Sequence, residues 1–460
     1  MDKKITITIL AMVILCSVVI YRARNTLPHK NKPNIIIINL DALRPDHLGC
    51  YGYARNTSPH IDDFARHSNL YLNCFSAATW TIPANYSLLT SLYPEQHTMY
   101  DWNSILDKKI PTMFSLLRDY GYVQGFFSNS GFLVKNFKVN FSQILNTCSN
   151  VSHAHSVTKS ALSWMQRQRA PFFAWIYYLE PHRPYTPPAP HNNLYTYQEG
   201  IQLPIEKVDK DYSGGWDYIP DTVAERKIQD VNYYIAQYDG EVHYVDEEVG
   251  KLLAELKRSG LFDQSLILLT SDHGESLGEH HLYFNHIFTL FNEVIKIPLF
   301  IKMPAQRQGV IVKENVSSLD ILPTVLNSIG IKDCQKCEGI NLFDAFNQKR
   351  GLFAYVSRNM YCFIYDTWKL IKYPRVSDEK HGYMKIFFPE YGSQEYQLFN
   401  MEKDPGELVD LKSMSVAEFQ ELISQLSQKV EKIKPMSETA EFFKIAEQEA
   451  EKMRSLGYVQ

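Results

Sequence analysis

The chain has 460 residues, enough for one large hydrophobic core and a smaller second unit, because single cores rarely grow beyond roughly 250 to 300 residues. Its formal net charge is −4 and its Lys and Arg residues are scattered, which excludes the basic field of a nucleic-acid-binding protein. Seven cysteines could form too few disulfides to stabilise a fold of this length, which excludes a disulfide scaffold.

The N-terminus carries an uncharged apolar run from Ile5 to Tyr21 between Lys4 and Arg22. Its length is at the lower limit for a membrane-spanning helix, and no small-residue cleavage site follows it. We therefore predict an uncleaved signal anchor over residues 1–24, followed by a polar linker over residues 25–33. Basic residues are more numerous after the run than before it, and that count alone would place the rest of the chain inside the cell.

Beyond the linker, apolar strand patterns alternate with helical patterns. This order predicts an α/β fold with a mainly parallel central sheet flanked by helices. The first strand is expected over Asn34 to Leu40, and it ends at Asp41.

The segment from Trp80 to His97 contains a second candidate functional residue, Thr81. Pro83 fits the first turn of a helix, so Thr81 would lie at a helix N-terminus, where free N–H groups and the helix dipole favour an anion. A nucleophile is well placed there, although a Thr in this position is more commonly only an N-cap.

A continuous apolar strand is predicted over Pro171 to Leu179, and His182 follows it. The next stretch, from Ala189 to Tyr218, has no clear period and is expected to be a surface insertion that influences substrate choice. A long core helix is then predicted from a capping box at Thr222 to a stop at Gly260.

The apolar run Ser265 to Leu269 is followed at once by Asp272 and His273. A buried strand that ends in adjacent carboxylate and imidazole ligands is a usual way for an α/β sheet to present a metal at its carboxyl edge. Because the first strand ends at Asp41, the two strand ends together predict a metal site.

The remaining chain yields three smaller predictions. Cys334 and Cys337 are expected to form a local disulfide or to stay unpaired rather than to bind zinc, because no second Cys or His pair accompanies them. A capping box at Ser415 predicts an amphipathic helix, and a final helix is predicted over residues 437–455.

Seven motifs follow one another along the chain: N-I-I-I-I-N-L-D-A-L-R-P-D-H-L-G-C-Y-G-Y, T-S-P-H-I-D-D-F-A, T-I-P-A-N-Y-S-L-L-T-S-L-Y-P, the Glu-Pro-His turn at His182, Y-D-G-E-V-H-Y-V-D, T-S-D-H-G-E-S-L-G-E-H and K-I-P-L-F-I. In this order they resemble the sulfatase family of the alkaline phosphatase superfamily. The resemblance covers roughly residues 32–411 and implies a catalytic domain over residues 34–340, with a smaller C-terminal α+β subdomain and helical tail over residues 341–460.

By this resemblance, Asp41, Asp272 and His273 match metal-ligand positions, and Thr81 occupies the position of the nucleophile, whose oxygen also touches the metal. His182 and His286 match positions that bind the transferred group or protonate the leaving oxygen. The implied cofactor is one divalent metal ion, with Zn or Mn favoured by the imidazole ligand and Ca or Mg possible. His182 and His286 could recruit a second ion.

The chain also departs from the family. Where sulfatases have a Cys that becomes formylglycine, this chain has Thr81, and where they have an Arg, it has Asn85. The sulfate-gripping Gly-Lys-x-His segment is also missing, because the corresponding region runs from Gly125 to Asn129. A metal-bound Thr resembles the phosphatases, phosphodiesterases and phosphoethanolamine transferases of the superfamily instead.

We therefore expect a membrane-anchored, metal-dependent hydrolase that cleaves a phosphate-type or sulfate-type ester through Thr81. Its partners would be the ester substrate, in the form of a glycan or a lipid, and the membrane. The catalytic domain is expected on the periplasmic, extracellular or lumenal side, as is usual for the family. The alternatives are a phosphoethanolamine-type transferase and a non-catalytic sulfatase-like binding protein.

Overall fold

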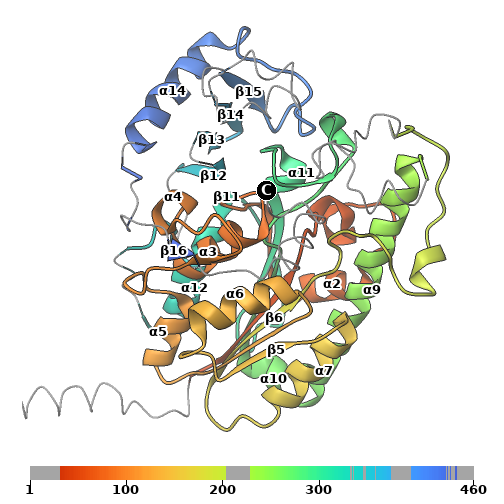
Figure 1. Ribbon diagram of the computed structural model, residues 1–460, viewed down its shortest axis with the longest axis vertical. Helices are drawn as coiled ribbons and strands as arrows, with labels where there is room; N and C mark the ends of the chain where they lie inside the picture. The colour runs from red at the N-terminus through yellow and green to blue at the C-terminus, as the bar shows by residue number, and fades with distance from the viewer. Residues whose placement is uncertain are drawn as a thin grey trace, which may run out of the picture.

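An eight-stranded sheet forms the centre of the molecule, in the order β11-β2-β10-β7-β1-β6-β4-β5 (Figure 1). Neighbouring strands are parallel, except that β10 is antiparallel to both β2 and β7. In sheet order the strands are Val310–Ser317, Asn69–Phe75, Lys296–Lys302, Ser265–Thr270, Asn34–Leu40, Phe172–Tyr178, Val123–Ser128 and Thr147–Asn150. The predicted mainly parallel sheet is confirmed. The computed structural model describes residues 32–203, 228–331, 334, 336–344, 349–357, 359–374, 395–430, 432–433, 436 and 441–442.

Strand β1 lies between β6 and β7, and its sequence explains why it is central. Four consecutive isoleucines, Ile35 to Ile38, are fully buried. Ile35 and Ile37 pack into the core on one face of the sheet, whereas Ile36 and Ile38 pack into the core on the other. In a strand covered on both faces, every side chain is buried, so polar and apolar residues do not alternate and a continuous β-branched run is stable.

Helices cover both faces of the sheet, as Figure 1 shows. The helices on one face share a core with Ile35 and Ile37: α3 (Thr81–Thr90), α5 (Met113–Asp119), α6 (Gly131–Phe141) and α12 (Ile321–Ser328). The helices on the other face share a core with Ile36 and Ile38: α2 (Pro59–Ala65), α7 (Ala154–Met165) and α9 (Val231–Arg258).

The long helix predicted from Thr222 is α9, which begins later, at Val231. Asp230 is its N-cap, with a side chain that accepts a hydrogen bond from the backbone N–H of Asn232 at 2.8 Å. The proposed capping box at Thr222 lies outside the described residues. The apolar stripe along the helix is confirmed as core, because residues such as Val242 and Val249 are fully buried.

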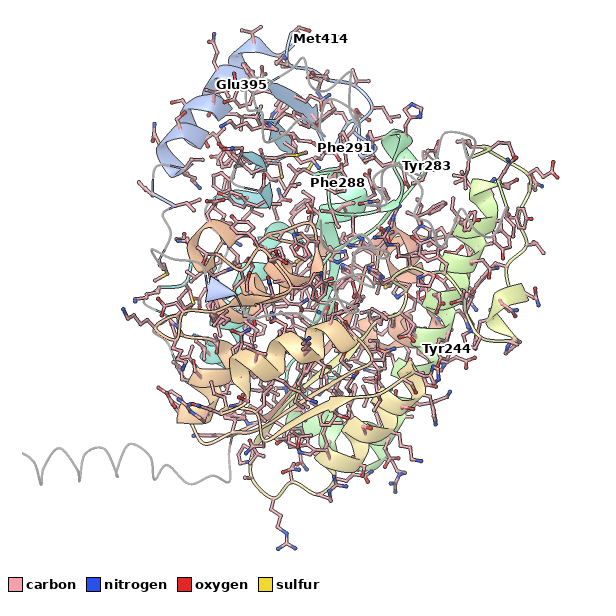
Figure 2. All side chains as sticks on the ribbon, in the orientation of Figure 1. Tyr244, Tyr283, Phe288, Phe291, Glu395 and Met414 are labelled. Atoms are coloured by element: carbon pink, nitrogen blue, oxygen red, sulfur yellow. A yellow bond between two sulfur atoms is a disulfide. The ribbon has the colours of Figure 1, made fainter. Side chains whose placement is uncertain are left out.

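A second sheet lies in the C-terminal part of the chain, and its antiparallel order is β12-β13-β14-β15. Helix α14 (Val416–Val430), predicted from the cap at Ser415, packs Leu422 and Leu426 against one face of this sheet. Phe291, which Figure 2 labels, packs against Phe399 on the other face, with ring centroids 5.8 Å apart. The strands are Gly351–Ser357, Met360–Tyr365, Trp368–Lys372 and Tyr396–Asn400.

This second sheet also holds the segment that leads into α3. The backbone N–H of Tyr355 in β12 donates to the carbonyl of Ala77 at 3.0 Å, and the N–H of Thr79 donates to the carbonyl of Tyr355 at 3.3 Å. Thr81 begins α3 only two residues later, so the C-terminal sheet fixes the path of the chain into the N-terminus of that helix.

Cys334 and Cys337 form a local disulfide, which is one of the two outcomes expected for this pair.

The predictions for the two ends of the chain have different outcomes. The final helix predicted over 437–455 is wrong at Glu441–Phe442, which form strand β16 beside β3 (Ser104–Ile105), because this tertiary pairing overrides local helix propensity; its other residues lie outside the described part. The proposed anchor over 1–24 also lies outside it, and no helix within the described ranges is long and apolar enough to cross a membrane.

Candidate active site

The predicted metal ligands follow neighbouring strands at one edge of the central sheet. Strands β1 and β7 pair in parallel up to Asn39 and Thr270, so Asp41 and Asp272 leave the sheet at the same level. The backbone N–H of Asp41 still donates to the carbonyl of Tyr178 in β6, at 2.9 Å. The carboxyl ends of parallel strands share an edge, and ligand sites in open α/β sheets lie beyond that edge.

Asp41, Asp272 and His273 offer one ligand atom each, and these three atoms lie within 4.8 Å of one another. The Nε2 atom of His273 is 3.4 Å from Oδ1 of Asp41 and 3.8 Å from Oδ2 of Asp272. All three side chains are buried. The structure therefore brings the predicted metal ligands together in a group that could hold a cation.

The electrostatics of Asp41 favour that cation. Burial raises the pKa of the Asp41 carboxyl well above its usual range, and the neighbouring carboxylate of Asp272 raises it further. The Oδ1 atom of Asp41 has no hydrogen-bond partner among the described residues. Two carboxylates in one buried site repel each other unless a positive charge lies between them, and a divalent ion supplies that charge.

The orientation of His273 suits a ligand. Its Nδ1 atom lies 2.8 Å from the carbonyl oxygen of Gly274, which can only accept, so Nδ1 carries the proton. The lone pair is then on Nε2, the atom that faces the two carboxylates. A backbone carbonyl that fixes the tautomer in this way is the usual support for a metal-binding histidine.

Thr81 lies at the first turn of α3 and faces the same group. Its Oγ1 atom is 3.3 Å from Nε2 of His273, and the side chain is 1% exposed. Trp80 occupies the N-cap position, so the Thr81 hydroxyl is not needed to cap the helix. The structure thus places this hydroxyl beside the candidate ligands and at the positive end of a helix dipole.

His182 and His286 lie beside His273, so the structure brings both remaining predicted residues to the site. The ring centroids of His273 and His286 are 4.1 Å apart, and those of His182 and His286 are 5.1 Å apart. Burial lowers the pKa of both His182 and His286 well below the usual range, and a neighbouring histidine lowers each one further. Both rings are therefore neutral at ordinary pH.

Each of these rings is held by its Nδ1 atom. Nδ1 of His182 donates to the carbonyl of Arg183 at 2.7 Å, and Nδ1 of His286 lies 3.0 Å from a carboxylate oxygen of Glu275. These contacts leave Nε2 of each ring as the atom with a lone pair. Nε2 of His286 is buried and has no hydrogen-bond partner in the described part of the chain.

The site is supported by three further residues, which hydrogen-bond to its side chains or backbone. The sequence had not indicated a function for them. Asn85 donates from Nδ2 to Oδ2 of Asp272 at 2.9 Å and to the carbonyl of Thr81 at 2.8 Å. Tyr177 donates from its hydroxyl to Oδ2 of Asp272 at 2.8 Å. Glu275 orients His286. The motif T-S-D-H-G-E contains Glu275, but Tyr177 is inside an apolar strand and carries no sequence signal of this role.

The contact of Tyr177 predicts an effect of the variant Tyr177→Phe. Loss of the hydroxyl removes one donor to Asp272, and changes to such outer contacts typically lower metal affinity about 10- to 100-fold. We expect a loss in this range when metal affinity is measured by competition with a chelator.

The matched control is Tyr178→Phe, since Tyr178 is the next residue of β6. Its hydroxyl lies 2.8 Å from that of Thr158, on the opposite face of the sheet from Tyr177. This variant should retain wild-type metal affinity. Like Tyr177→Phe, it loses one buried hydrogen bond, so each variant should lower the free energy of unfolding by about 1 kcal/mol. Equal metal affinity in the two variants would show that Tyr177 does not support the ligand Asp272.

Comparison with known proteins identifies the family. The family model for sulfatases matches residues 33–331, and the model described as N-sulphoglucosamine sulphohydrolase, C-terminal, matches residues 278–436. An arylsulfatase of Clostridium perfringens is 22% identical over 466 aligned residues, covering 86% of this chain and 93% of that protein.

Solved structures agree in fold. The phosphonate monoester hydrolase of Agrobacterium radiobacter is 18% identical with a TM-score of 0.68, over 91% of this chain and 99% of that one. A protein solved in complex with its substrate D-glucosamine-2-N,6-O-disulfate is 17% identical with a TM-score of 0.69, over 89% and 100% of the two chains. The resemblance drawn from the sequence motifs is confirmed, because the sulfatase model covers well over half of the residues: the chain belongs to the sulfatase family.

Proposed function

We propose that this sulfatase-family hydrolase of sulfuric or phosphoric esters uses Thr81 as its nucleophile and one divalent metal ion held by Asp41, Asp272 and His273. One observation carries the proposal. The Thr81 hydroxyl, at the N-terminus of α3, lies 3.3 Å from Nε2 of His273, whose lone pair also faces the two carboxylates.

A divalent ion in this site would neutralise charge on the nucleophile and on the ester oxygens. The protein's own groups add two further effects. The N-terminus of α3 favours an anion beside Thr81. The neutral imidazoles of His182 and His286, which lie close to His273, would bind the transferred group or handle the proton of the leaving oxygen.

Substrate binding itself would prepare these histidines. Both imidazoles are neutral in the free protein, because burial lowers the pKa of each. An anionic ester beside them raises the pKa of an imidazole, and Glu275 lies within 3.0 Å of His286 to stabilise its protonated form. A proton taken up by His286 in this way can pass to the leaving oxygen when the ester bond breaks.

The identity of residue 81 favours phosphate over sulfate. Oxidation of a threonine would give a ketone, so the aldehyde hydrate that expels sulfate from formylglycine cannot form at Thr81. A phospho-threonine intermediate, by contrast, can be opened by water activated at a metal. The donor set of one imidazole and two carboxylates favours Zn or Mn over Ca, which prefers oxygen ligands alone.

A substrate panel tests this preference. The purified full chain, loaded with Zn or Mn, should hydrolyse nitrophenyl phosphate, a phosphodiester or a phosphonate ester at least about 10-fold faster than nitrophenyl sulfate, because only a phosphorylated Thr81 has an escape route. Initial rates at matched substrate concentrations give the comparison. Faster cleavage of the sulfate by protein in which mass spectrometry finds Thr81 unmodified would contradict the phosphate preference.

We also propose that the N-terminal run anchors the protein, with the catalytic domain outside the cytoplasm. The support is the uncharged sequence from Ile5 to Tyr21 after Lys3 and Lys4, which is a normal signal start. In cells whose cytoplasmic membrane is intact and whose outer membrane, where there is one, has been made permeable, protease added from outside should therefore digest a tag at the C-terminus. Protection of that tag, with digestion only after lysis, would reverse the topology.

A further inference from the structure

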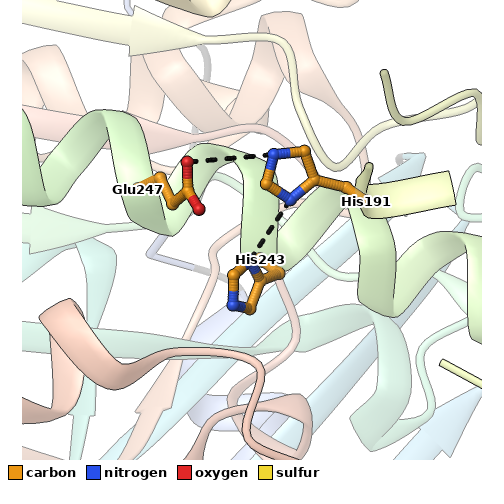
Figure 3. Close-up of side chains that lie close together, drawn as sticks. All are labelled: His191, His243 and Glu247. Atoms are coloured by element: carbon orange, nitrogen blue, oxygen red, sulfur yellow. Dashed lines mark hydrogen bonds and ion pairs between the residues drawn. The ribbon is translucent and has the colours of Figure 1, made fainter. Parts of the chain in front are cut away.

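A second group of potential metal ligands lies outside the active site, between α9 and the 3₁₀ helix η4 (His191–Asn193). It consists of His191 from η4 and of His243 and Glu247 from α9 (Figure 3). We infer that these three residues bind a zinc ion, or a transition-metal ion of similar preference, that joins the beginning of the 189–218 insertion to α9.

The spacing on α9 provides two of the ligands. His243 and Glu247 are four residues apart, so their side chains project from the same face of the helix on consecutive turns. A histidine and a carboxylate at this spacing can reach one ion without bending the helix. Imidazole nitrogens and a carboxylate oxygen are also the donor set that zinc accepts in proteins.

The distances among the three side chains suit one small ion. The Nδ1 atoms of His191 and His243 are 3.2 Å apart, and Nε2 of His191 is 3.8 Å from Oε2 of Glu247 (Figure 3). Two nitrogens bound to one tetrahedral zinc at about 2.0–2.1 Å would lie about 3.3 Å apart. The observed separation of the two Nδ1 atoms therefore needs almost no adjustment. One ion binds only one nitrogen of His191, so the Glu247 carboxylate, which contacts Nε2 in the structure, has to turn toward the Nδ1 side. One ligand atom from each residue already lies within 4.8 Å of the others.

The backbone around His191 is held in place independently of any ion. Gly240 of α9 allows η4 to lie directly on the helix, because a Cβ atom there would be 2.7 Å from the carbonyl oxygen of His191. The side chain of Gln237 donates to the carbonyl of Asn192 at 2.9 Å. A glycine inside a helix costs about 1 kcal/mol relative to alanine, so close contact with η4 is what this position provides. His191 is thereby presented to His243 by a rigid frame.

The surroundings leave the ligands both available and reachable. His191 is buried, whereas the Glu247 side chain is 40% exposed, so an ion can enter from the solvent side. Among the described residues, the two imidazoles share one hydrogen bond, and Nε2 of His191 has a long contact of 3.8 Å to Glu247.

An ion here would also stabilise the approach to the active site. Tyr238 lies on α9 just over one turn before His243. Its hydroxyl donates to the carbonyl of Ala42 at 2.8 Å and accepts from the backbone N–H of Arg44 at 2.9 Å. Ala42 directly follows the candidate ligand Asp41. A metal that fixes η4 on α9 thus stabilises the helix that holds this strand end.

The zinc content of the protein tests the inference directly. The full chain is purified in detergent without a histidine tag, loaded with zinc and desalted. Elemental mass spectrometry then gives the number of zinc ions per chain. The variants His243→Gln and Glu247→Gln should each contain about one zinc per chain less than the wild type. Glu247 is partly exposed, so that variant tests the site even if His243→Gln does not fold.

The matched control is His155→Gln. His155 lies 3.4 Å from Glu248, the neighbour of Glu247 on α9, but this pair has no second histidine beside it in the described residues. It should retain the zinc content of the wild type. Equal zinc content in wild type and in folded Glu247→Gln would overturn the inference. All these variants keep Asp41, Asp272 and His273, so a failure of the proposed catalytic metal would appear separately, as no loss of metal in Asp272→Asn.

Discussion

Replacement of Thr81 by alanine should abolish ester hydrolysis while leaving the fold and the bound metal in place. Removal of a covalent nucleophile typically lowers kcat by on the order of 10⁴-fold or more. The fold should tolerate the change, because Trp80 rather than Thr81 occupies the N-cap of α3 and alanine is a good helix former. Steady-state rates, metal analysis and thermal unfolding measure the three quantities.

Two further variants sharpen this result. Thr81→Ser keeps a hydroxyl at the same place and should retain part of the activity. Thr90→Ala is the matched control, since Thr90 is a buried threonine at the other end of α3, where its hydroxyl donates to the carbonyl of Tyr86 at 2.7 Å. It should lose stability, about 1 kcal/mol, but not activity. Near wild-type turnover by Thr81→Ala on every ester tested would show that the mechanism is not covalent at this residue.

The second large effect is expected for Asp272→Asn, which should lower metal content and activity together. The substitution removes a negative charge from the ligand group and places an amide where Tyr177 and Asn85 both donate to Oδ2. Changes outside the ligand shell already cost about 10- to 100-fold in metal affinity, so the loss of a ligand should cost at least about 100-fold. Elemental analysis after desalting, alongside initial rates, gives both values.

Asp46→Asn controls for the loss of a nearby negative charge. Asp46 also follows β1, but its carboxylate pairs with Arg44, at 2.7 Å, and it belongs to neither candidate metal group. This variant should keep its metal. If Asp272→Asn contained as much metal as the wild type, Asp272 would not be a ligand, and the assignment of the site would have to be abandoned.

The strand ends of the site could be predicted from the sequence because their signals are local. The apolar runs of β1 and β7 are continuous, and each is followed within two residues by an acidic side chain. Parallel pairing then brings Asp41 and Asp272 to one edge without any further information. The place of Thr81 at a helix N-terminus could be predicted for a similar reason, since Pro83 marks the first turn of α3.

The supporting contacts could not be predicted, because they depend on tertiary packing. Tyr177 lies in the uninterrupted apolar strand β6, where a tyrosine is usually core, and only its pairing with β1 brings its hydroxyl to Asp272. Asn85 appeared only as the residue that replaces an arginine. In the structure it joins the start of α3 to Asp272, and its Oδ1 accepts from Asn39 of β1 at 3.0 Å.

The same limit explains the errors at helix ends. The cap of α9 is Asp230, and the strand at Glu441–Phe442 exists because it pairs with Ser104 and Ile105, which are far away in the sequence. The candidate second metal site has the same origin. His243 and Glu247 have a recognisable helical spacing, but His191 reaches them only because Gly240 lets η4 lie on α9.

The stereochemical course of phosphate ester hydrolysis tests the central claim most directly. In a single direct displacement, water inverts the configuration at phosphorus. Two successive in-line displacements, first by Thr81 and then by water, restore it. With a thiophosphate ester made chiral by two oxygen isotopes and hydrolysed in water of the third isotope, the account predicts net retention of configuration. Net inversion would show that water attacks the ester directly and would contradict the role of Thr81 as the nucleophile.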